Sequence, residues 1–346
     1  MHAVITSGLK TACDARPTIA PDEAKRAERS RFTNRTPSFR AERSRRGVSA
    51  VEVVVILAIL GTFALFLMMA LPRQRETGRL ASCRNNLMHV GCALALYDMR
   101  TGQLPTVPEP GTSGPQVGRS PLQALLDELS VTDLTAVNDP RDAPAKHPNP
   151  PRGERRVRGF LCPSDPLATA SFRPAPISYR ATTGAAPDGR DGAFAPGRRV
   201  SLAMIEASDG LGYTAAFAER LVGDGQSGPG LGNYAVTSGP VPATGCPAPD
   251  PSSWRGDAGA SWLASDWRST LYNHVEPPGA SPSCLSGDGR TASMRATSGH
   301  SEGVNVLICD GSVRTMTPRI DPKLWREWAA FPGPTSVSLP NPERKE

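Results

Sequence analysis

The segment from Val53 to Leu71 constrains this chain more than any other stretch of its sequence. Its only polar side chain is Thr62. A helix of this length spans the roughly 30 Å hydrocarbon core of a bilayer. A secretory h-region is shorter, at about 7–15 residues, and ends at a small-residue cleavage site that is not visible here. A buried core helix is rarely apolar on every face over such a length. We therefore expect residues 48–72 to form a membrane-spanning helix.

The charges before this segment predict its orientation. Residues 1–47 contain eleven Lys and Arg residues and five Asp and Glu residues. By the positive-inside rule this end stays in the cytoplasm, and Arg73, Arg75 and Arg79 on the far side weaken the bias without reversing it. We expect a single-pass protein of the inner (cytoplasmic) membrane, with a periplasmic or otherwise extracytoplasmic C-terminal domain.

The same count bears on nucleic-acid binding. The whole chain has 39 basic and 33 acidic residues, so removing eleven and five leaves 28 of each. The net charge of +6 therefore belongs to the N-terminal segment. The neutral remainder has no basic stripe with interleaved aromatic residues, which argues against a nucleic-acid partner.

Glu52 is an acid at the front of the apolar segment, and it suggests a binding partner. A charge inside a bilayer costs about 2.5–3.5 kcal/mol on insertion scales. The stretch "RRGVSAVEVVV" resembles the cleavage site of type IV prepilins and type II secretion pseudopilins. In that family a prepilin peptidase cuts after a glycine, methylates the new N-terminus and leaves a glutamate at mature position five. The resemblance implies Gly47 as the leader's last residue, Val48 as the mature N-terminus and Glu52 as that glutamate.

The spacing of Val48 and Glu52 fits a role in assembly. Residues i and i+4 lie one turn apart on the same helix face. In a stack of subunits, the Glu52 carboxylate of one chain would meet the α-amine of a neighbour, which lowers the cost of holding both charges in lipid. The alternative is a plain signal anchor, in which Glu52 lies near the headgroups and reaches water.

Helical periodicity resumes after the apolar segment. Pro72 is placed to kink or end the membrane helix. An apolar stripe then recurs at steps of three and four, as in an amphipathic helix over residues 73–101: Leu80, Cys83, Leu87, Val90, Leu94 and Tyr97. Gly102 and Pro105 end this segment. The resemblance to pilins implies that the stripe packs on a sheet.

Residues 102–330 have the pattern of a loop-rich body. Apolar runs are short ("AAFAE", "NYAVT", "VNVLI", "SVRTM"), and Asp-Gly pairs separate them. Such runs predict short strands. "SPLQALLDEL" from Ser120 predicts a serine-capped helix with proline in its first turn. Residues 138–159 predict an exposed basic, proline-rich excursion, and residues 331–346 a tail. We expect an α+β, pilin-like fold: a long N-terminal helix packed on an antiparallel β body.

Several motifs of this body make the resemblance more specific. "FLCPSDP", "ISYRATTGA", "STLYNHVEPPGASPSC" and "SGHSEGVNVLICDGSVRTM" occur in this order. The chain is similar to a large family of exported, pilin-like proteins with a C-terminal H-x9-DG module, named for prepilin-type processing. The biochemical role of that family is unassigned, so the resemblance implies location and architecture rather than an activity.

His300 and Asp310 of the H-x9-DG motif are not expected to share a site. Asp310-Gly311 between two strand patterns predicts a two-residue type I′ hairpin turn. This register puts Ile308 opposite Val313 and Val306 opposite Thr315, with Val304, Val306, Ile308 and Val313 buried on one face. His300 then lies on the order of 20 Å from Asp310 at about 3.3 Å per residue. An extended ladder would instead place His300 opposite Asp321.

The cysteines predict disulfides in the exported body. Cys13 leaves with the leader, and an even six remain: Cys83, Cys92, Cys162, Cys246, Cys284 and Cys309. Six cysteines allow fifteen pairings, which the sequence does not resolve. We favour Cys246–Cys284, which brackets a Trp-rich stretch, and then Cys83–Cys162, which would tie the helix to the body. Cys309 is a candidate free thiol.

Signals for an enzyme are weak. The five histidines have no zinc-site spacing, and neither a nucleophile elbow, a P-loop nor a dinucleotide fingerprint is present. We expect no catalytic residues, metal or cofactor. The favoured hypothesis is a pilin-like subunit of an envelope secretion or adhesion assembly, with the membrane, a prepilin peptidase and other pilin-like subunits as partners. The alternatives are a monomeric tethered binding domain, exported by the same signal, and an anchored hydrolase.

Overall fold

The computed structural model describes residues 49–109, 120–129, 156–168, 175–279 and 282–331, without the side chains of residues 64 and 66–73. The proposed cleavage site Gly47–Val48, most of the 138–159 segment and the tail after Phe331 lie outside these residues. The chain divides into two compact units, and the boundary lies between Arg75 and Glu76.

Helix α2 (Ala50–Thr101) crosses this boundary and does not end at Pro72. Ser49 caps its start, because the Ser49 Oγ accepts from the Val51 amide and the Ser49 carbonyl accepts from the Val53 amide. Gly102 ends it with a φ of 74°, a left-handed conformation that favours glycine at this position. Within the part of the chain that the structure describes, no helix is long and apolar enough to cross a membrane.

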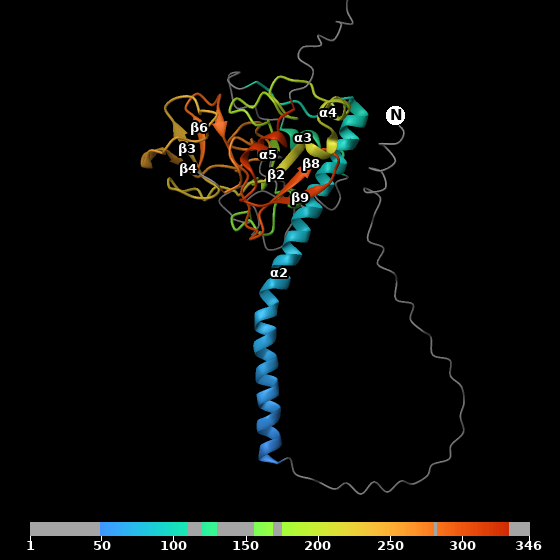
Figure 1. The fold of residues 1–346 in the computed structure, drawn as a ribbon, viewed down its shortest axis with the longest axis vertical. Coiled ribbons are helices and arrows are strands. Elements are labelled where there is room, and N and C mark those ends of the chain that lie inside the picture. Colours follow the sequence, from blue (N-terminus) through green and yellow to red (C-terminus); the bar gives the residue numbers. More distant parts are fainter. Residues whose placement is uncertain (1–48, 110–119, 130–155, 169–174, 280–281, 332–346) are drawn as a thin grey trace, which may run out of the picture. The chain divides into compact units, whose positions relative to one another are not determined.

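A five-stranded sheet forms the centre of the larger unit. Its strand order is β5-β1-β2-β8-β9. The strands are β1 (Tyr179–Thr182), β2 (Ala215–Glu219), β5 (Leu271–Tyr272), β8 (Val304–Ile308) and β9 (Val313–Met316). Figure 1 shows β2, β8 and β9 beside the C-terminal half of α2. Strands β1 and β5 run parallel, and the other neighbours in this sheet run antiparallel.

A second sheet has four short strands in the order β4-β3-β6-β7. They are β3 (Tyr234–Thr237), β4 (Trp254–Arg255), β6 (Ser283–Ser286) and β7 (Ala292–Ser293). Here β3 and β6 are parallel. The expected α+β class is therefore confirmed, but the expectation of an antiparallel body is wrong because both sheets are mixed. Long connections separate β1 from β5 and β3 from β6, and a parallel pair requires such a crossover.

The second half of α2 packs on the central sheet through its apolar stripe. Cys83, Leu87, Val90 and Leu94 of the stripe are buried. A Cβ atom at Gly91 would lie 2.9 Å from Leu307 Cδ1 of β8, so the glycine allows the helix to approach the strand closely. The Arg84 guanidinium also donates to the Val313 carbonyl at the start of β9.

The β8–β9 hairpin has a different register from the expected one. Leu307 pairs with Val313, Val306 with Arg314 and Val304 with Met316. Opposed residues point to the same face, so Val313 shares the face of Leu307, opposite to the face of Val304, Val306 and Ile308. All of these valines and Ile308 are buried, but the prediction that they share one face is wrong.

A three-residue loop explains the shift by one residue. The Gly311 amide donates to the Ile308 carbonyl and the Ile308 amide donates to the Ser312 carbonyl, so the loop contains Cys309, Asp310 and Gly311. Gly311 has a φ of 87°. This is the arrangement of a turn followed by a left-handed glycine, which competes with the two-residue type I′ turn for the same Asp-Gly pair.

Short helices complete the larger unit. They are α3 (Pro121–Ala124), α4 (Leu202–Ser208), α5 (Pro322–Glu327) and the 3-10 helices η2 (Arg158–Phe160), η3 (Leu211–Tyr213) and η4 (Pro251–Ser253). Ser120 caps α3 as expected, since its Oγ accepts from the Gln123 amide. Asp321 caps α5 by accepting from the amides of Lys323 and Leu324.

Candidate functional site

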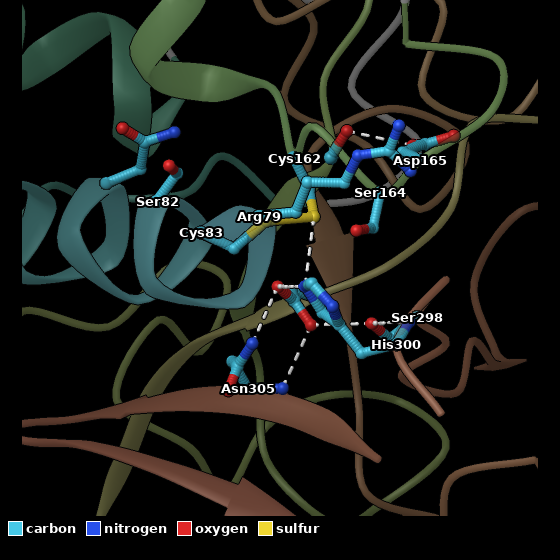
Figure 2. The surroundings of a disulfide bond; sticks show 12 residues. Arg79, Ser82, Cys83, Cys162, Ser164, Asp165, Ser298, His300 and Asn305 are labelled. Atoms are coloured by element: carbon cyan, nitrogen blue, oxygen red, sulfur yellow. Dashed lines mark hydrogen bonds and ion pairs between the residues drawn. A yellow bond between two sulfur atoms is a disulfide. The ribbon is translucent and has the colours of Figure 1, made fainter. Parts of the chain in front are cut away.

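The most distinctive cluster of the described residues surrounds a buried disulfide. Cys83 on α2 bonds Cys162, which follows η2. His300, which lies just before β8, points toward this bond, with its Nε2 3.4 Å from the Cys162 Sγ (Figure 2). Three segments that are distant in the sequence therefore meet at one point of the core.

Two carboxylates flank the His300 imidazole. The Glu76 Oε1 on α2 lies 2.6 Å from Nδ1, and the Glu219 Oε1 at the end of β2 lies 3.5 Å from Nε2. The Ser164 hydroxyl donates to Glu76. The imidazole can therefore donate from both ring nitrogens when it is protonated.

Glu219 is buried, and three hydrogen bonds hold its carboxylate in place. The Asn305 amide donates to its Oε2, and the Asn305 Nδ2 donates to its Oε1. The Ser298 hydroxyl also donates to Oε2. A buried carboxylate needs such donors, because an unpaired charge in the core is strongly destabilising. These bonds fix the carboxylate beside His300.

The pKa of His300 is raised above its usual value. Burial of the imidazole opposes the charged form, but hydrogen bonding and charge attraction from Glu219, followed by those from Glu76, outweigh it. The positively charged imidazolium therefore persists to higher pH than in a free histidine. Chemically, the cluster is a Glu–His–Glu ion network against a disulfide, in which His300 and Glu219 are buried and Glu76 is half-buried.

A pocket of about 510 Å³ opens beside the disulfide. Its lining includes Cys162, Ser164, Asp165, Arg79 and Arg158. Asp165 is buried and accepts from the Ser178 hydroxyl and from the Val222 and Leu167 amides. Burial raises the pKa of Asp165, and these hydrogen bonds only partly oppose the rise. Of the two disulfide-bonded residues, Cys162 lines this pocket and Cys83 does not.

A comparison with protein-family models identifies the family of the chain. A family model described as "Protein of unknown function (DUF1559)" matches residues 72–323, well over half of the chain. The chain belongs to the DUF1559 family. Comparisons with the curated proteins and with the solved structures found no match.

In this DUF1559 protein, the residues of the H-x9-DG motif have separate roles. His300 lies in the disulfide cluster, while the Asp310 Oδ1 accepts from the Ser312 amide within the hairpin loop. The hypothesis that His300 contacts Asp321 is wrong. The chain leaves the ladder after Met316, and the Asp321 side chain caps α5 instead.

Both cysteine pairs that the sequence favoured are bonded. Cys83–Cys162 joins the helix to the body, and Cys246–Cys284 closes the Trp-rich stretch. Cys309 is a free, buried thiol, and burial raises its pKa. It is therefore a poor nucleophile, because the thiolate is the reactive form. Cys92 is disulfide-bonded as well.

Three members of the site were not predicted from the sequence: Glu76, Glu219 and Asn305. Glu76 precedes Cys83 by seven residues, which places both on one helix face, and Glu219 ends the apolar strand "AAFAE". The helical spacing of Glu76 and the strand-end position of Glu219 are the sequence features from which these two residues could have been found. The expectation of no metal ligands rested on local spacing, but the fold brings potential ligand atoms of Cys83, Cys162, Glu219 and His300 within 4.8 Å of one another.

Glu52 has a local partner in the structure. Its Oε2 accepts from the Ser49 amide at 2.9 Å, while the Ser49 Oγ accepts from the Val51 amide. This reciprocal arrangement is a capping box, which "SAVE" encodes as S-x-x-E. Glu52 therefore stabilises the start of its own helix, a role that the resemblance to prepilins does not imply.

His274 is a second buried histidine, and its role is structural. Its ring stacks on Trp325 with centroids 3.6 Å apart. Nδ1 lies 2.7 Å from the Trp325 carbonyl and Nε2 lies 2.9 Å from the Tyr272 hydroxyl. Burial lowers the pKa of His274 to about 3, so the ring is neutral and links β5 to α5.

Proposed function

We propose that this DUF1559 protein is a pilin-like subunit of a cell-envelope secretion or adhesion assembly. It is anchored in the cytoplasmic membrane by residues 48–72, exposes its body on the extracytoplasmic side and is processed by a prepilin peptidase. The role is structural and not enzymatic. The partners are the peptidase, the membrane and other pilin-like subunits.

The observation that carries this proposal is the organisation of α2. One helix of 52 residues joins an apolar N-terminal half to an amphipathic half that packs on a sheet. Large apolar side chains of the first half are exposed, among them Val54, Leu57 and Phe63. Such a surface needs an apolar environment, either lipid or the helices of other subunits. This organisation supports a pilin-like role over a plain globular one.

Processing is tested by the intact mass of the membrane-extracted chain. We expect the mass of Val48–Glu346 plus one methyl group. Gly47→Leu should block cleavage, because the peptidase requires the glycine by resemblance to prepilins. Gly61→Leu is the matched control, since a Cβ at Gly61 has no atom within 4 Å. A full-length wild-type mass would contradict the proposal and favour the plain anchor.

The role of Glu52 in assembly is separated from its role as a cap by two substitutions. Glu52→Gln keeps a side chain that can complete a capping box but removes the charge. Glu52→Ala removes both. If the carboxylate pairs with the α-amine of a neighbour, both variants lose crosslinks between cysteines placed at positions 53–60, while the chain is still exported. If the glutamine variant crosslinks like the wild type, the charge has no role in assembly.

The alternative is a monomeric, membrane-tethered binding domain that uses the prepilin signal only for export. The pocket beside Cys162 favours it, because it is a concave surface with polar and charged residues. The same crosslinking experiment distinguishes the two functions. A processed chain without any crosslink between subunits would support the tethered domain.

A further inference from the structure

The disulfide cluster contains a set of side chains that bind transition metals. Two cysteines, one imidazole and one carboxylate converge from α2, the segment after η2, the segment before β8 and the end of β2. Figure 2 shows the two cysteines with His300 beside them. All four residues are buried. Thiolate, imidazole and carboxylate are the ligands that Zn²⁺ takes in proteins, usually four at a time.

We propose that the chain with Cys83 and Cys162 reduced binds one Zn²⁺-type divalent cation through both thiolates, the His300 Nε2 and the Glu219 carboxylate. The cluster then has two forms, a disulfide and a metal site. The proposal concerns the body and is independent of cleavage or assembly.

The separations between the ligand atoms match a tetrahedral site. Zn–S bonds of about 2.3 Å and Zn–N or Zn–O bonds of about 2.0–2.2 Å place neighbouring ligand atoms about 3.3–3.8 Å apart. The His300 Nε2 lies 3.4 Å from the Cys162 Sγ and 3.5 Å from the Glu219 Oε1. These two distances already match the separation between ligand atoms in a tetrahedral site. The two sulfur atoms must separate, which a χ1 adjustment of either thiol permits once the covalent bond is broken.

The groups around the ligands fit a metal site as well. A ligating histidine usually donates its other ring N–H to a carboxylate, which fixes the tautomer. Glu76 occupies this place, with its Oε1 2.6 Å from the His300 Nδ1. Glu219 is oriented by Asn305 and Ser298. The ligands therefore have a nearly complete outer shell before any metal binds.

The pocket supplies an entry path. Cys162 lines the space of about 510 Å³, so a reductant and a cation would approach the disulfide from this side. A dithiol attacks one sulfur, the Cys83–Cys162 bond breaks, and the dithiol leaves as a cyclic disulfide while two thiols remain on the chain. Binding of Zn²⁺ then releases one proton from each thiol and, where the imidazole is protonated, one from the His300 Nε2.

The test uses the full-length chain in detergent, reduced with a water-soluble phosphine. One phosphine and one water convert each disulfide into two thiols and a phosphine oxide. After removal of the phosphine without oxygen, Co²⁺ is added as a spectroscopic substitute for zinc. We expect a thiolate-to-cobalt charge-transfer band with intense tetrahedral d–d bands, which one equivalent of Zn²⁺ abolishes. The oxidised chain should show neither.

Substitutions locate the site. Cys162→Ser, His300→Gln and Glu219→Gln should each weaken or abolish the cobalt spectrum, and Glu76→Gln should lower the affinity about 10–100-fold. The matched controls are Cys309→Ser and the double variant Cys246→Ser/Cys284→Ser, which remove other thiols of the body and should retain the spectrum. Far-UV circular dichroism of each reduced variant monitors the fold.

Alkylation of the wild-type chain gives a readout that needs no variant. Zn²⁺ should protect Cys83 and Cys162 of the reduced chain from iodoacetamide, as read by peptide mass spectrometry, and leave Cys246 and Cys284 reactive. A reduced chain that binds no Co²⁺, whether folded or unfolded, overturns the proposal. Protection of a different cysteine pair, or a cobalt spectrum unchanged by Cys162→Ser and His300→Gln, overturns it as well.

Discussion

His300 is the residue on which the two carboxylates of the disulfide cluster converge. Glu76 and Glu219 flank its ring, and each carboxylate has hydroxyl or amide donors of its own. A buried ion network of this kind is stable only when nearly every member is satisfied. His300 therefore holds α2, β2 and the start of β8 in one arrangement, and it does so best when protonated.

We predict that this network makes stability depend on pH. Since the folded-state pKa of His300 is raised above 6.5, its contribution is fully present below about pH 6.5 and is lost as the pH rises through the folded pKa. Urea unfolding of the oxidised chain, followed by tryptophan fluorescence, should give a higher midpoint at about pH 6 than at about pH 9. His300→Gln should lower stability by about 1–3 kcal/mol at the lower pH.

The control for this prediction is the dependence of the urea midpoint on pH. His300→Gln removes the titrating group, so its midpoint should change less between the two pH values than that of the wild type. Glu327→Gln, which removes an exposed carboxylate 3.8 Å from Lys323, should leave the slope as it is. A wild-type midpoint that rises with pH would contradict the assignment.

At the residue scale, sequence reasoning found the cysteines and the turn residues but not the network. Asp310 and Gly311 have local signatures, because a turn is specified by neighbours in the sequence. Glu76 and His300 are 224 residues apart, and Asn305 and Glu219 are 86 apart. A single sequence contains no signal for such pairs until the fold is known.

At the scale of elements, the hairpin shows that strands can be predicted at the correct residues while the face of one of them is predicted wrongly. Both strands were predicted at their observed positions. A three-residue loop in place of a two-residue turn moved Val313 from the partner of Ile308 to the partner of Leu307. A shift of one residue exchanges the faces of a strand. Apolar residues occupy both faces of β8, so burial could not fix the register in advance.

Helix α2 packs on this hairpin at Gly91, which leads to a prediction with a matched control. A side chain at Gly91 would meet Leu307 and also the Gly311 backbone at 3.3 Å, whereas a Cβ at Gly78 of the same helix has no atom within 4 Å. We expect Gly91→Leu to lower the free energy of unfolding by about 1–3 kcal/mol. Gly78→Leu should raise it by up to about 1 kcal/mol, because leucine is the better helix former.

Urea unfolding of both variants with the disulfides intact shows whether the close contact at Gly91 outweighs the higher helix propensity of leucine. If the two leucine variants had the same stability, the close approach of α2 to β8 would be wrong. Reduced protection of β8 amides in hydrogen exchange, in Gly91→Leu alone, would place the effect at the helix–sheet contact.

At the scale of the whole larger unit, Arg220 joins the two mixed sheets. It directly follows β2 of the central sheet, and its guanidinium donates to the Ser283 hydroxyl on β6 of the second sheet. It also donates to the carbonyls of Arg295 and Gly232. The parallel pairs β1–β5 and β3–β6 depend on long connections, which the short apolar runs of the sequence do not specify. The α+β class could therefore be predicted, but the strand order could not.

The last prediction tests this link between the sheets. Arg220→Lys should lower the free energy of unfolding by about 2–3 kcal/mol. An ammonium lacks the planar fork that reaches Ser283, Arg295 and Gly232 together, so buried acceptors lose their donors. Burial already lowers the pKa of Arg220, and a lysine there would lose its proton far more readily. Arg290→Lys, at an exposed position, is the matched control and should stay within about 0.5 kcal/mol of the wild type. Equal stability of the two variants in urea unfolding would show that the guanidinium does not hold the sheets together, and the shared apolar core would then have to do so alone.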